Sequence, residues 1–155
     1  MRFLDLKIPP VIVFVAVALL MLGCTHWVPS ATWPMPGRRF TAFFMLAWGL
    51  LIGGLSISAF KAHQTSLNPH RPHKTVTLVT RGIYRQTRNP MYLGLLFLLI
   101  GWGIYLSNVV ALLGLPLFVL YMTEFQIKPE ERVLAEKFGT SYIGYASTVK
   151  RWWLF

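Results

Sequence analysis

Four long apolar stretches divide the chain, and each is bounded by polar, basic or proline-rich residues. They cover about residues 8–28, 40–60, 91–106 and 109–127. A transmembrane α-helix needs about 20 apolar residues to cross a hydrocarbon core of about 30 Å. The pattern therefore predicts an all-α integral membrane protein with about four spanning helices. Composition supports this class, because 55% of the residues are hydrophobic and 13% are charged.

The connections predict how neighbouring helices pair. Only Ser107 and Asn108 separate the last two apolar stretches, so these stretches should form a tight antiparallel hairpin. The second stretch carries Gly49 and Gly53, a spacing that lets membrane helices approach closely. Such a pair also occurs by chance, so a specific contact is left open. We expect one domain over residues 1–155, with a long loop at 61–90 and a tail at 128–155.

The tail is first charged and then aromatic. Pro129, Glu130 and Glu131 are typical of a helix start, and Gly139 of a helix end. The tail should therefore contain a short amphipathic helix outside the membrane, with Val133, Leu134 and Phe138 on its apolar face. Indole rings favour the membrane interface, so the final Arg-Trp-Trp-Leu-Phe should lie at the headgroup boundary.

Basic residues predict the orientation. Of the fifteen Lys and Arg, only Arg38 and Arg39 lie in the two short connections. The other thirteen lie in the N-terminus, the 61–90 loop and the tail, which the positive-inside rule places in the cytoplasm. This orientation accounts for the formal charge of +10, so we expect no nucleic-acid partner. A prokaryotic inner membrane fits this composition, and nothing in the sequence indicates the oligomeric state.

Cys24 ends a segment, Met21-Leu22-Gly23-Cys24, that is similar to a lipoprotein cleavage site. The segment lacks the usual leucine at its first position, and Asp5 lies among the early basic residues. We therefore expect the first helix to be retained, which a mass measurement of the amino terminus would decide. A single cysteine also excludes an intramolecular disulfide and a cysteine-based metal cluster.

Three of the four histidines lie in the basic segment 61–74, which invites comparison with a metal site. His70 and His73 flank Arg71 and Pro72, with no cysteine or carboxylate nearby, and zinc sites favour such ligands. We expect no metal. The segment is instead expected to lie near a functional centre on the cytoplasmic side or to bind anionic headgroups. Gln64, Thr65 and Asn68 are its candidate substrate-binding residues.

Two polar clusters carry a resemblance to a known family. The first runs from Leu78-Val79-Thr80-Arg81-Gly82-Ile83-Tyr84 to Arg88-Asn89-Pro90-Met91-Tyr92-Leu93-Gly94. The second follows the hairpin and contains Glu130-Glu131, Phe138-Gly139, Tyr142, Tyr145 and Val149. In this order they resemble the isoprenylcysteine carboxyl methyltransferase family and its phospholipid methyltransferase relatives, especially the small prokaryotic members. The resemblance implies a helical membrane enzyme that transfers a methyl group from S-adenosylmethionine to a lipophilic acceptor and releases S-adenosylhomocysteine.

This resemblance also implies a site on the cytoplasmic side. Glu130 and Glu131 would accept hydrogen bonds from ribose hydroxyls or the ammonium, and Arg88 would donate to the carboxylate. The expected cofactor-binding residues are Leu78, Val79, Gly82, Tyr84, Asn89, Tyr92, Gly94, Glu130 and Glu131, with Gly94 allowing close approach of a ligand. Arg88 is the candidate catalytic residue, and Arg88 or Arg151 would orient the acceptor. Both clusters must then reach one small molecule.

One position departs from the family pattern. Asn89 stands where the eukaryotic prenylcysteine enzymes have histidine, and an amide does not titrate near neutral pH. Prenylcysteine specificity is therefore not carried over. The alternative function is a non-catalytic membrane scaffold or lipid-binding protein. Without the resemblance, Glu130 and Glu131 would be interpreted as an ordinary helix start. Glu124 is expected to form an ion pair with Lys128, one helical turn later.

Overall fold

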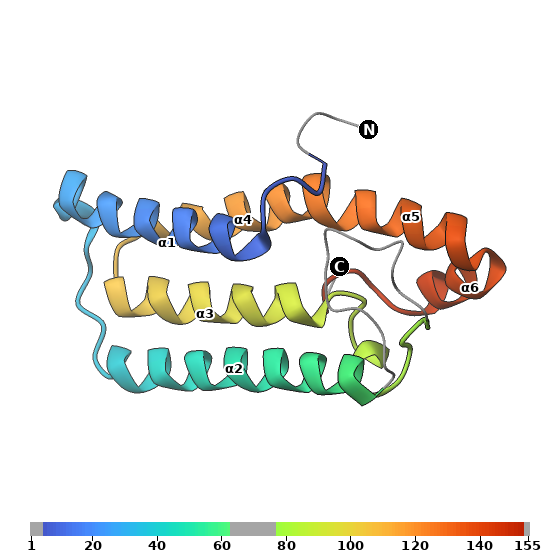
Figure 1. The fold of residues 1–155 in the computed structure, drawn as a ribbon. Coiled ribbons are helices and arrows are strands. Elements are labelled where there is room, and N and C mark those ends of the chain that lie inside the picture. The colour runs from blue at the N-terminus through green and yellow to red at the C-terminus, as the bar shows by residue number, and fades with distance from the viewer. Residues whose placement is uncertain (1–4, 63–76, 154–155) are drawn as a thin grey trace.

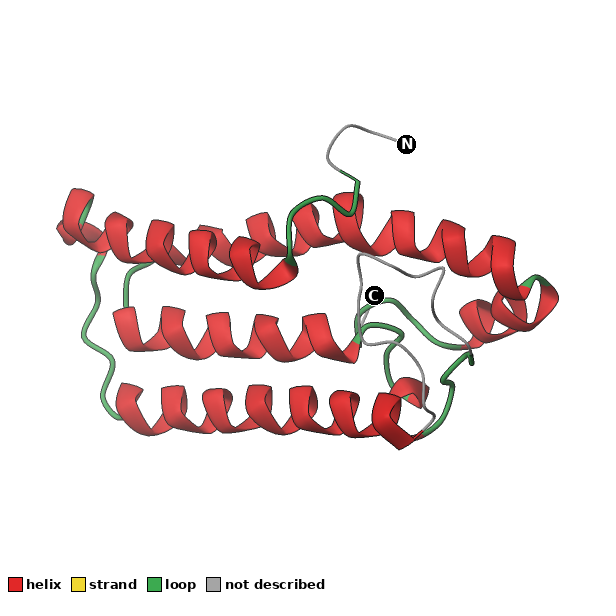
Figure 2. Ribbon diagram, in the orientation of Figure 1, coloured by secondary structure: helices red, strands yellow, loops and turns green. Residues whose placement is uncertain are grey.

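The computed structural model describes residues 5–62 and 77–153, and in these two ranges the elements are helices, with no strand (Figure 2). The main helices are α1 (Pro10–Trp27), α2 (Arg38–Ala62), α3 (Pro90–Leu106), α4 (Gly114–Met122), α5 (Lys128–Phe138) and α6 (Thr140–Thr148). Short helical turns are η1 (Pro29–Ala31), η3 (Gly82–Arg85) and η4 (Ala111–Leu113), and η5 (Thr123–Ile127) is π-helical. The predicted all-α class is confirmed.

Within the described residues, three helical stretches are long and apolar enough to cross a bilayer: Pro10–Trp27, Arg38–Lys61 and Ala111–Phe138. The helix Pro90–Leu106 is also apolar but has 17 residues, or about 25 Å of helix. Large apolar side chains such as Leu19 and Phe40 are exposed along the outside, where lipid would cover them. The chain is thus an integral membrane protein.

Helices α2 and α3 lie side by side, while α1 and α4 pack together over α3 (Figure 1). Glycines make the α2–α3 contact close. A Cβ added to Gly94 would lie 2.9 Å from the carbonyl oxygen of Gly49 and 3.1 Å from the nitrogen of Gly53. The Gly49–Gly53 spacing therefore does mediate a specific helix contact, and its partner is α3.

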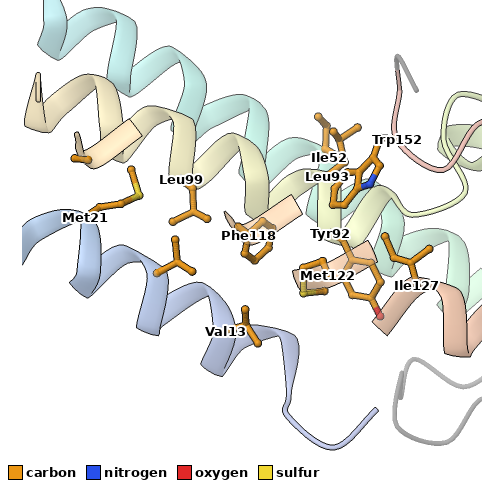
Figure 3. Packing of buried hydrophobic residues seen from close by; sticks show 12 residues of the cluster. Val13, Met21, Ile52, Tyr92, Leu93, Leu99, Phe118, Met122, Ile127 and Trp152 are labelled. Carbon is orange, nitrogen blue, oxygen red and sulfur yellow. The ribbon is translucent and has the colours of Figure 1, made fainter. Parts of the chain in front are cut away.

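The buried core joins all four membrane helices (Figure 3). Leu99, Phe118 and Met21 are fully buried in it. Met21 lies toward one end of the cluster, and Tyr92, Ile127 and Trp152 lie toward the other. The core therefore continues from the hydrophobic bundle directly into the part of the chain that carries the polar clusters.

The two short connections meet at one end of the bundle. Ser107 adopts a left-handed conformation with φ 49° and ends α3 as predicted for the hairpin turn. Its carbonyl accepts a hydrogen bond from the Trp33 N–H at 3.0 Å, and an isolated β-bridge joins Thr32 to Asn108. The Asn108 side chain also accepts from the Ala111 N–H at 3.0 Å. The described ends of the chain lie at the opposite end (Figure 1).

The predicted helix start at Pro129 is wrong, because α4, η5 and α5 form one continuous helix. The junction residues Thr123, Ile127 and Lys128 all keep right-handed helical angles. Proline has no N–H to donate to the carbonyl four residues earlier. That carbonyl, on Phe125, instead accepts from the Leu6 N–H at 2.9 Å. A long-range hydrogen bond and the π-helical turn thus allow the helix to pass through Pro129.

Gly139 ends α5 as predicted, with φ 52°, but a further helix, α6, follows it at once. The expectation for the aromatic end is wrong for Trp152, which is 2% exposed. Its indole N–H donates to the Thr123 hydroxyl at 3.0 Å in the π-helical turn. The tail therefore folds back into the bundle, and only Trp153 of the pair is exposed.

Candidate functional site

Three segments distant in sequence meet at the end of the bundle where the described chain termini lie. They are the junction of η3 with α3, the first turn of α5, and residues 149–153, which we call the C-terminal arm (Figure 1). The hairpin of α3 with α4 brings the first two segments together, and α6 returns the arm between them. This arrangement places the two sequence clusters in one polar site.

Glu131 is the centre of this site. The Arg151 guanidinium donates to it in a fork, from Nε to Oε1 and Oε2 at 2.9 and 3.0 Å and from Nη2 to Oε2 at 2.8 Å. Arg88 Nη1 lies 3.3 Å from Oε1, and the Arg88 and Glu131 side chains are only 12% and 15% exposed. Hydrogen bonding to Glu131 raises the pKa of Arg151. One carboxylate thus connects both clusters and the arm.

Glu130 makes a separate contact with α3. The Tyr92 hydroxyl donates to Glu130 Oε2 at 3.1 Å, and Figure 3 shows the Tyr92 oxygen directed toward the chain beyond Ile127. A helix needs about 20 residues to cross a hydrocarbon core. Glu130 is farther than this along the helix from the Ser107–Asn108 turn, so it lies outside the hydrocarbon core. Burial raises the pKa of Glu130 to about 7, opposed by the Tyr92 hydrogen bond and reinforced by the Glu131 charge.

The C-terminal arm is held by the main chain as well as by Arg151. The Arg151 carbonyl accepts from the Thr87 hydroxyl at 2.7 Å and from the Asn89 amide at 3.1 Å. The Arg88 N–H donates to the Lys150 carbonyl at 2.9 Å. Asn89 therefore anchors the arm, a role that requires an amide donor and no titratable group.

Tyrosines cover the next layer of the site. The Tyr84 hydroxyl is hydrogen-bonded to Ser56 in α2 at 2.7 Å, and the Tyr84 carbonyl accepts from the Tyr145 hydroxyl at 2.7 Å. Tyr142 is 5% exposed. Burial raises the pKa of Tyr142 to about 12, with the nearby Glu131 charge adding to the shift and Arg88 opposing it. These phenols are neutral at physiological pH and supply aromatic walls and hydroxyls.

The predicted residues divide into two groups. Contacts bring together Arg88, Asn89, Tyr92, Glu130, Glu131 and Arg151. Gly94 lies against α2. The group that approaches it closely is the Gly49 backbone, where the sequence predicts a ligand. Gly82 has φ +62° and open space around it. The positive φ of this turn, which favours glycine, explains the residue. Val79 is buried and Leu78 half-buried before that turn. Gln64, Thr65 and Asn68, like His70 and His73, lie outside the described residues.

The sequence does not predict several residues of this site. Thr87 contacts the arm, and Tyr142 and Tyr145 belong to the tyrosine layer. Both tyrosines lie in the second polar cluster, and that position is the signal that could have identified them. Thr87 and Trp152 carry no such signal, because their roles depend on where the arm returns.

One buried donor in the site has no protein acceptor within residues 5–62 and 77–153: Arg88 Nε. A buried guanidinium nitrogen ordinarily has a hydrogen-bond partner. Arg88 Nε fits an anionic acceptor such as a carboxylate, while the oxygens of Glu130 and Glu131 fit hydroxyl or ammonium donors. The cluster thus offers both a donor for an anionic group and acceptors for a cationic one.

An apolar groove of about 370 Å³ lies beside this polar cluster. It runs between α2 and α3, and Gln86 and Thr87 line it where it borders the cluster. The remaining lining residues are apolar: Phe44, Met45, Trp48, Ile52, Ile83, Leu93, Phe97 and Trp153. A hydrocarbon chain in the groove would therefore have its polar end close to Arg88, the residue after Thr87.

Comparison with known proteins gives several similarities. A family model described as phospholipid methyltransferase matches residues 38–141. An uncharacterized protein of Haemophilus influenzae is 45% identical over 62 residues, which is 40% of this chain and 98% of that protein. Protein-S-isoprenylcysteine O-methyltransferase A of Arabidopsis thaliana is 36% identical over 72 residues, 46% of this chain and 36% of that enzyme.

The Xenopus laevis protein-S-isoprenylcysteine O-methyltransferase is 36% identical over 73 residues, 47% of this chain and 25% of that enzyme. The matches thus cover a minor part of the named methyltransferases. No solved structure gives a significant match.

Proposed function

The chain belongs to the phospholipid methyltransferase family, and we propose that it transfers a methyl group from S-adenosylmethionine to a lipophilic acceptor. We further propose that residues 1–155 act as one methyltransferase domain in a prokaryotic inner membrane, with the polar site in the cytoplasm. The observation that carries this proposal is the contact between the two motifs, Arg88 with Glu131 and Tyr92 with Glu130. Of the twelve Lys and Arg in residues 5–62 and 77–153, all but Arg38 and Arg39 lie toward the end of the bundle that carries this site, which supports the cytoplasmic orientation.

The site residues match the chemical groups of the cofactor. Glu130 and Glu131 would accept from its ribose hydroxyls and α-ammonium, and Arg88 Nε would donate to its carboxylate. Tyr92 and Tyr142 would pack near the base. Gly94 is left out of this set, because its close contact with α2 explains the glycine. S-adenosylmethionine supplies an activated methyl group when it is bound.

Transfer of that methyl group requires alignment more than acid–base chemistry. The acceptor atom forms the new bond to carbon while the carbon–sulfur bond breaks, and a thiol or amine acceptor also loses its proton. Arg88 and Arg151 would orient an anionic acceptor, and the arm would exclude water. Trp152, anchored on Thr123, fixes the arm in that position.

The acceptor's hydrocarbon chain would occupy the apolar groove between α2 and α3. The groove borders the polar cluster at Thr87, whose hydroxyl is bonded to the Arg151 carbonyl. A carboxylate, thiol or amine at the end of such a chain would therefore lie near Arg88. The similar enzymes are named for isoprenylcysteine and the family for phospholipids, and we propose that the acceptor belongs to one of these lipid-linked classes.

Binding and transfer together test the proposal. Protein purified in detergent should show saturable heat on titration with S-adenosylhomocysteine. With tritiated S-adenosylmethionine, organic-extractable label should appear when a prenylated cysteine or phosphatidylethanolamine is added. A scaffold or lipid-binding protein would give neither signal. Saturable binding without transfer to either acceptor would retain the cofactor site and reject these acceptor classes.

The raised pKa of Glu130 predicts a pH dependence. A carboxyl with a pKa of about 7 carries its charge only above that pH, so S-adenosylhomocysteine binding should weaken as the pH falls from 8 to 6. In Tyr92→Phe the hydroxyl that favours the ionised form is lost, so the midpoint should move to higher pH. Glu130→Gln should bind weakly with no inflection near pH 7. An unchanged pH profile in Glu130→Gln would show that another group is responsible.

A further inference from the structure

A second cleft lies at the opposite end of the bundle from the polar site. It has a volume of about 540 Å³ and lies between the start of α2 and the end of α3. The two short connections join these helix ends to α1 and α4 (Figure 1). Gly101 forms part of its floor, where an added Cβ would lie 3.0 Å from the Ala42 carbonyl oxygen. The two backbones thus touch beneath the cleft, and larger side chains form its walls.

The rim of this cleft carries positive charge, and within residues 5–62 and 77–153 no Asp or Glu forms an ion pair with Arg38 or Arg39. Arg39 lines the cleft and is exposed, and Arg38 lies with its guanidinium 6.0 Å from the centre of the Tyr105 ring. The sequence contains no Asp or Glu from residue 6 to residue 123. The acidic residues all lie at the other end, in the N-terminal segment and near or within α5. A bound anion from outside the chain would neutralise these arginines.

The walls below the arginines are apolar and aromatic. Phe43 and Leu46 come from α2, while Trp102 and Tyr105 come from α3 and stack with their ring centres 5.8 Å apart. Aromatic rings of this kind favour the level of the lipid headgroups. A cationic rim above an apolar wall matches a molecule with an anionic head and a hydrocarbon tail.

We propose that this cleft binds one anionic phospholipid of the leaflet opposite the polar site. Its phosphate is held by Arg38 and Arg39, and an acyl chain lies along Phe43, Leu46 and Trp102. Basic pockets between membrane helices bind anionic headgroups in this way. The lipid would cover the contact between α2 and α3 at the end where Gly101 allows the two backbones to touch. This proposed lipid site is independent of methyl transfer.

Native mass spectrometry in detergent tests this site, with palmitoyl-oleoyl phosphatidylglycerol as the probe and phosphatidylcholine of the same chains for comparison. Wild-type protein should retain phosphatidylglycerol preferentially. The double variant Arg38→Gln/Arg39→Gln should bind it about 30-fold more weakly, because each basic residue contributes about fivefold to anionic-lipid attraction. Arg81→Gln/Arg85→Gln removes the same charge at the polar end from exposed positions and should keep the wild-type affinity.

A matched pair of phenylalanine variants tests the contact with the acyl chain. Phe43→Ser removes a cleft residue that is 71% exposed, whereas Phe40→Ser removes one that is 84% exposed and does not line the cleft. Phe43→Ser should weaken phosphatidylglycerol binding several-fold, and Phe40→Ser should not. Equal binding of both lipids, or unchanged binding in the Arg38/Arg39 double variant, would overturn the proposal. Neither outcome bears on S-adenosylhomocysteine binding at the other end.

Discussion

Glu131→Gln should weaken S-adenosylhomocysteine binding about 100-fold and abolish methyl transfer. Glu131 is the acceptor for the Arg151 fork and the counter-ion of Arg88. In the proposed site the Glu131 carboxylate would also accept a hydrogen bond from the cofactor, and a hydrogen bond to a charged group contributes about 1.5–3 kcal/mol. A loss of about 2.7 kcal/mol corresponds to about 100-fold in affinity.

Calorimetric titration would measure this change, with Glu136→Gln as the matched control. Glu136 lies in the same helix, is exposed, and loses the same charge on substitution, so its variant should bind within about twofold of wild type by the usual behaviour of surface positions. Arg151→Lys keeps the charge of the arm but loses the fork and should bind with intermediate affinity. Wild-type affinity in Glu131→Gln would show that this carboxylate does not contribute to the cofactor site.

Gly94→Ala should destabilise the bundle by about 2 kcal/mol, within the range for overpacked sites. The added Cβ would lie 2.9 Å from the Gly49 carbonyl oxygen and 3.1 Å from the Gly53 nitrogen. Both neighbours are backbone atoms of α2, so relief requires separation of two helices along their interface. The effect should appear as a lower Tm in detergent.

Gly54→Ala is the control for this substitution. Gly54 lies in α2, in the same helix that Gly94 contacts, and an added Cβ there has nothing within 4 Å. Its Tm should equal or exceed that of wild type, because alanine is the better helix former. If the two variants had the same Tm, the close approach of α2 and α3 would not limit stability. A ligand role for Gly94 would instead predict normal Tm and impaired S-adenosylhomocysteine binding.

Motif order indicated more of the site than any single residue did. Two short polar clusters that flank a hydrophobic hairpin predict Arg88, Tyr92, Glu130 and Glu131 as site residues, and the structure brings these residues into contact. Arg151 is predicted to orient the acceptor, and the structure adds that its guanidinium contacts Glu131 and its carbonyl anchors Asn89. Whether these residues bind a cofactor stays a prediction.

The sequence alone determined the membrane helices, the Ser107–Asn108 turn and the helix end at Gly139. These features depend on local properties: the length of an apolar stretch, the brevity of a connection and the conformational freedom of glycine. The order of the two motifs along the hairpin was equally visible, because an antiparallel pair returns the chain to the side where it began.

Only the tertiary structure decided which groups meet. Helix continuation through Pro129 depends on Leu6 reaching the Phe125 carbonyl, and burial of Trp152 depends on the π-helical turn at Thr123. The partner of Gly94 proved to be α2. Each of these contacts joins residues separated by many positions in the chain, so its energy arises from packing and hydrogen bonding that no local sequence pattern records.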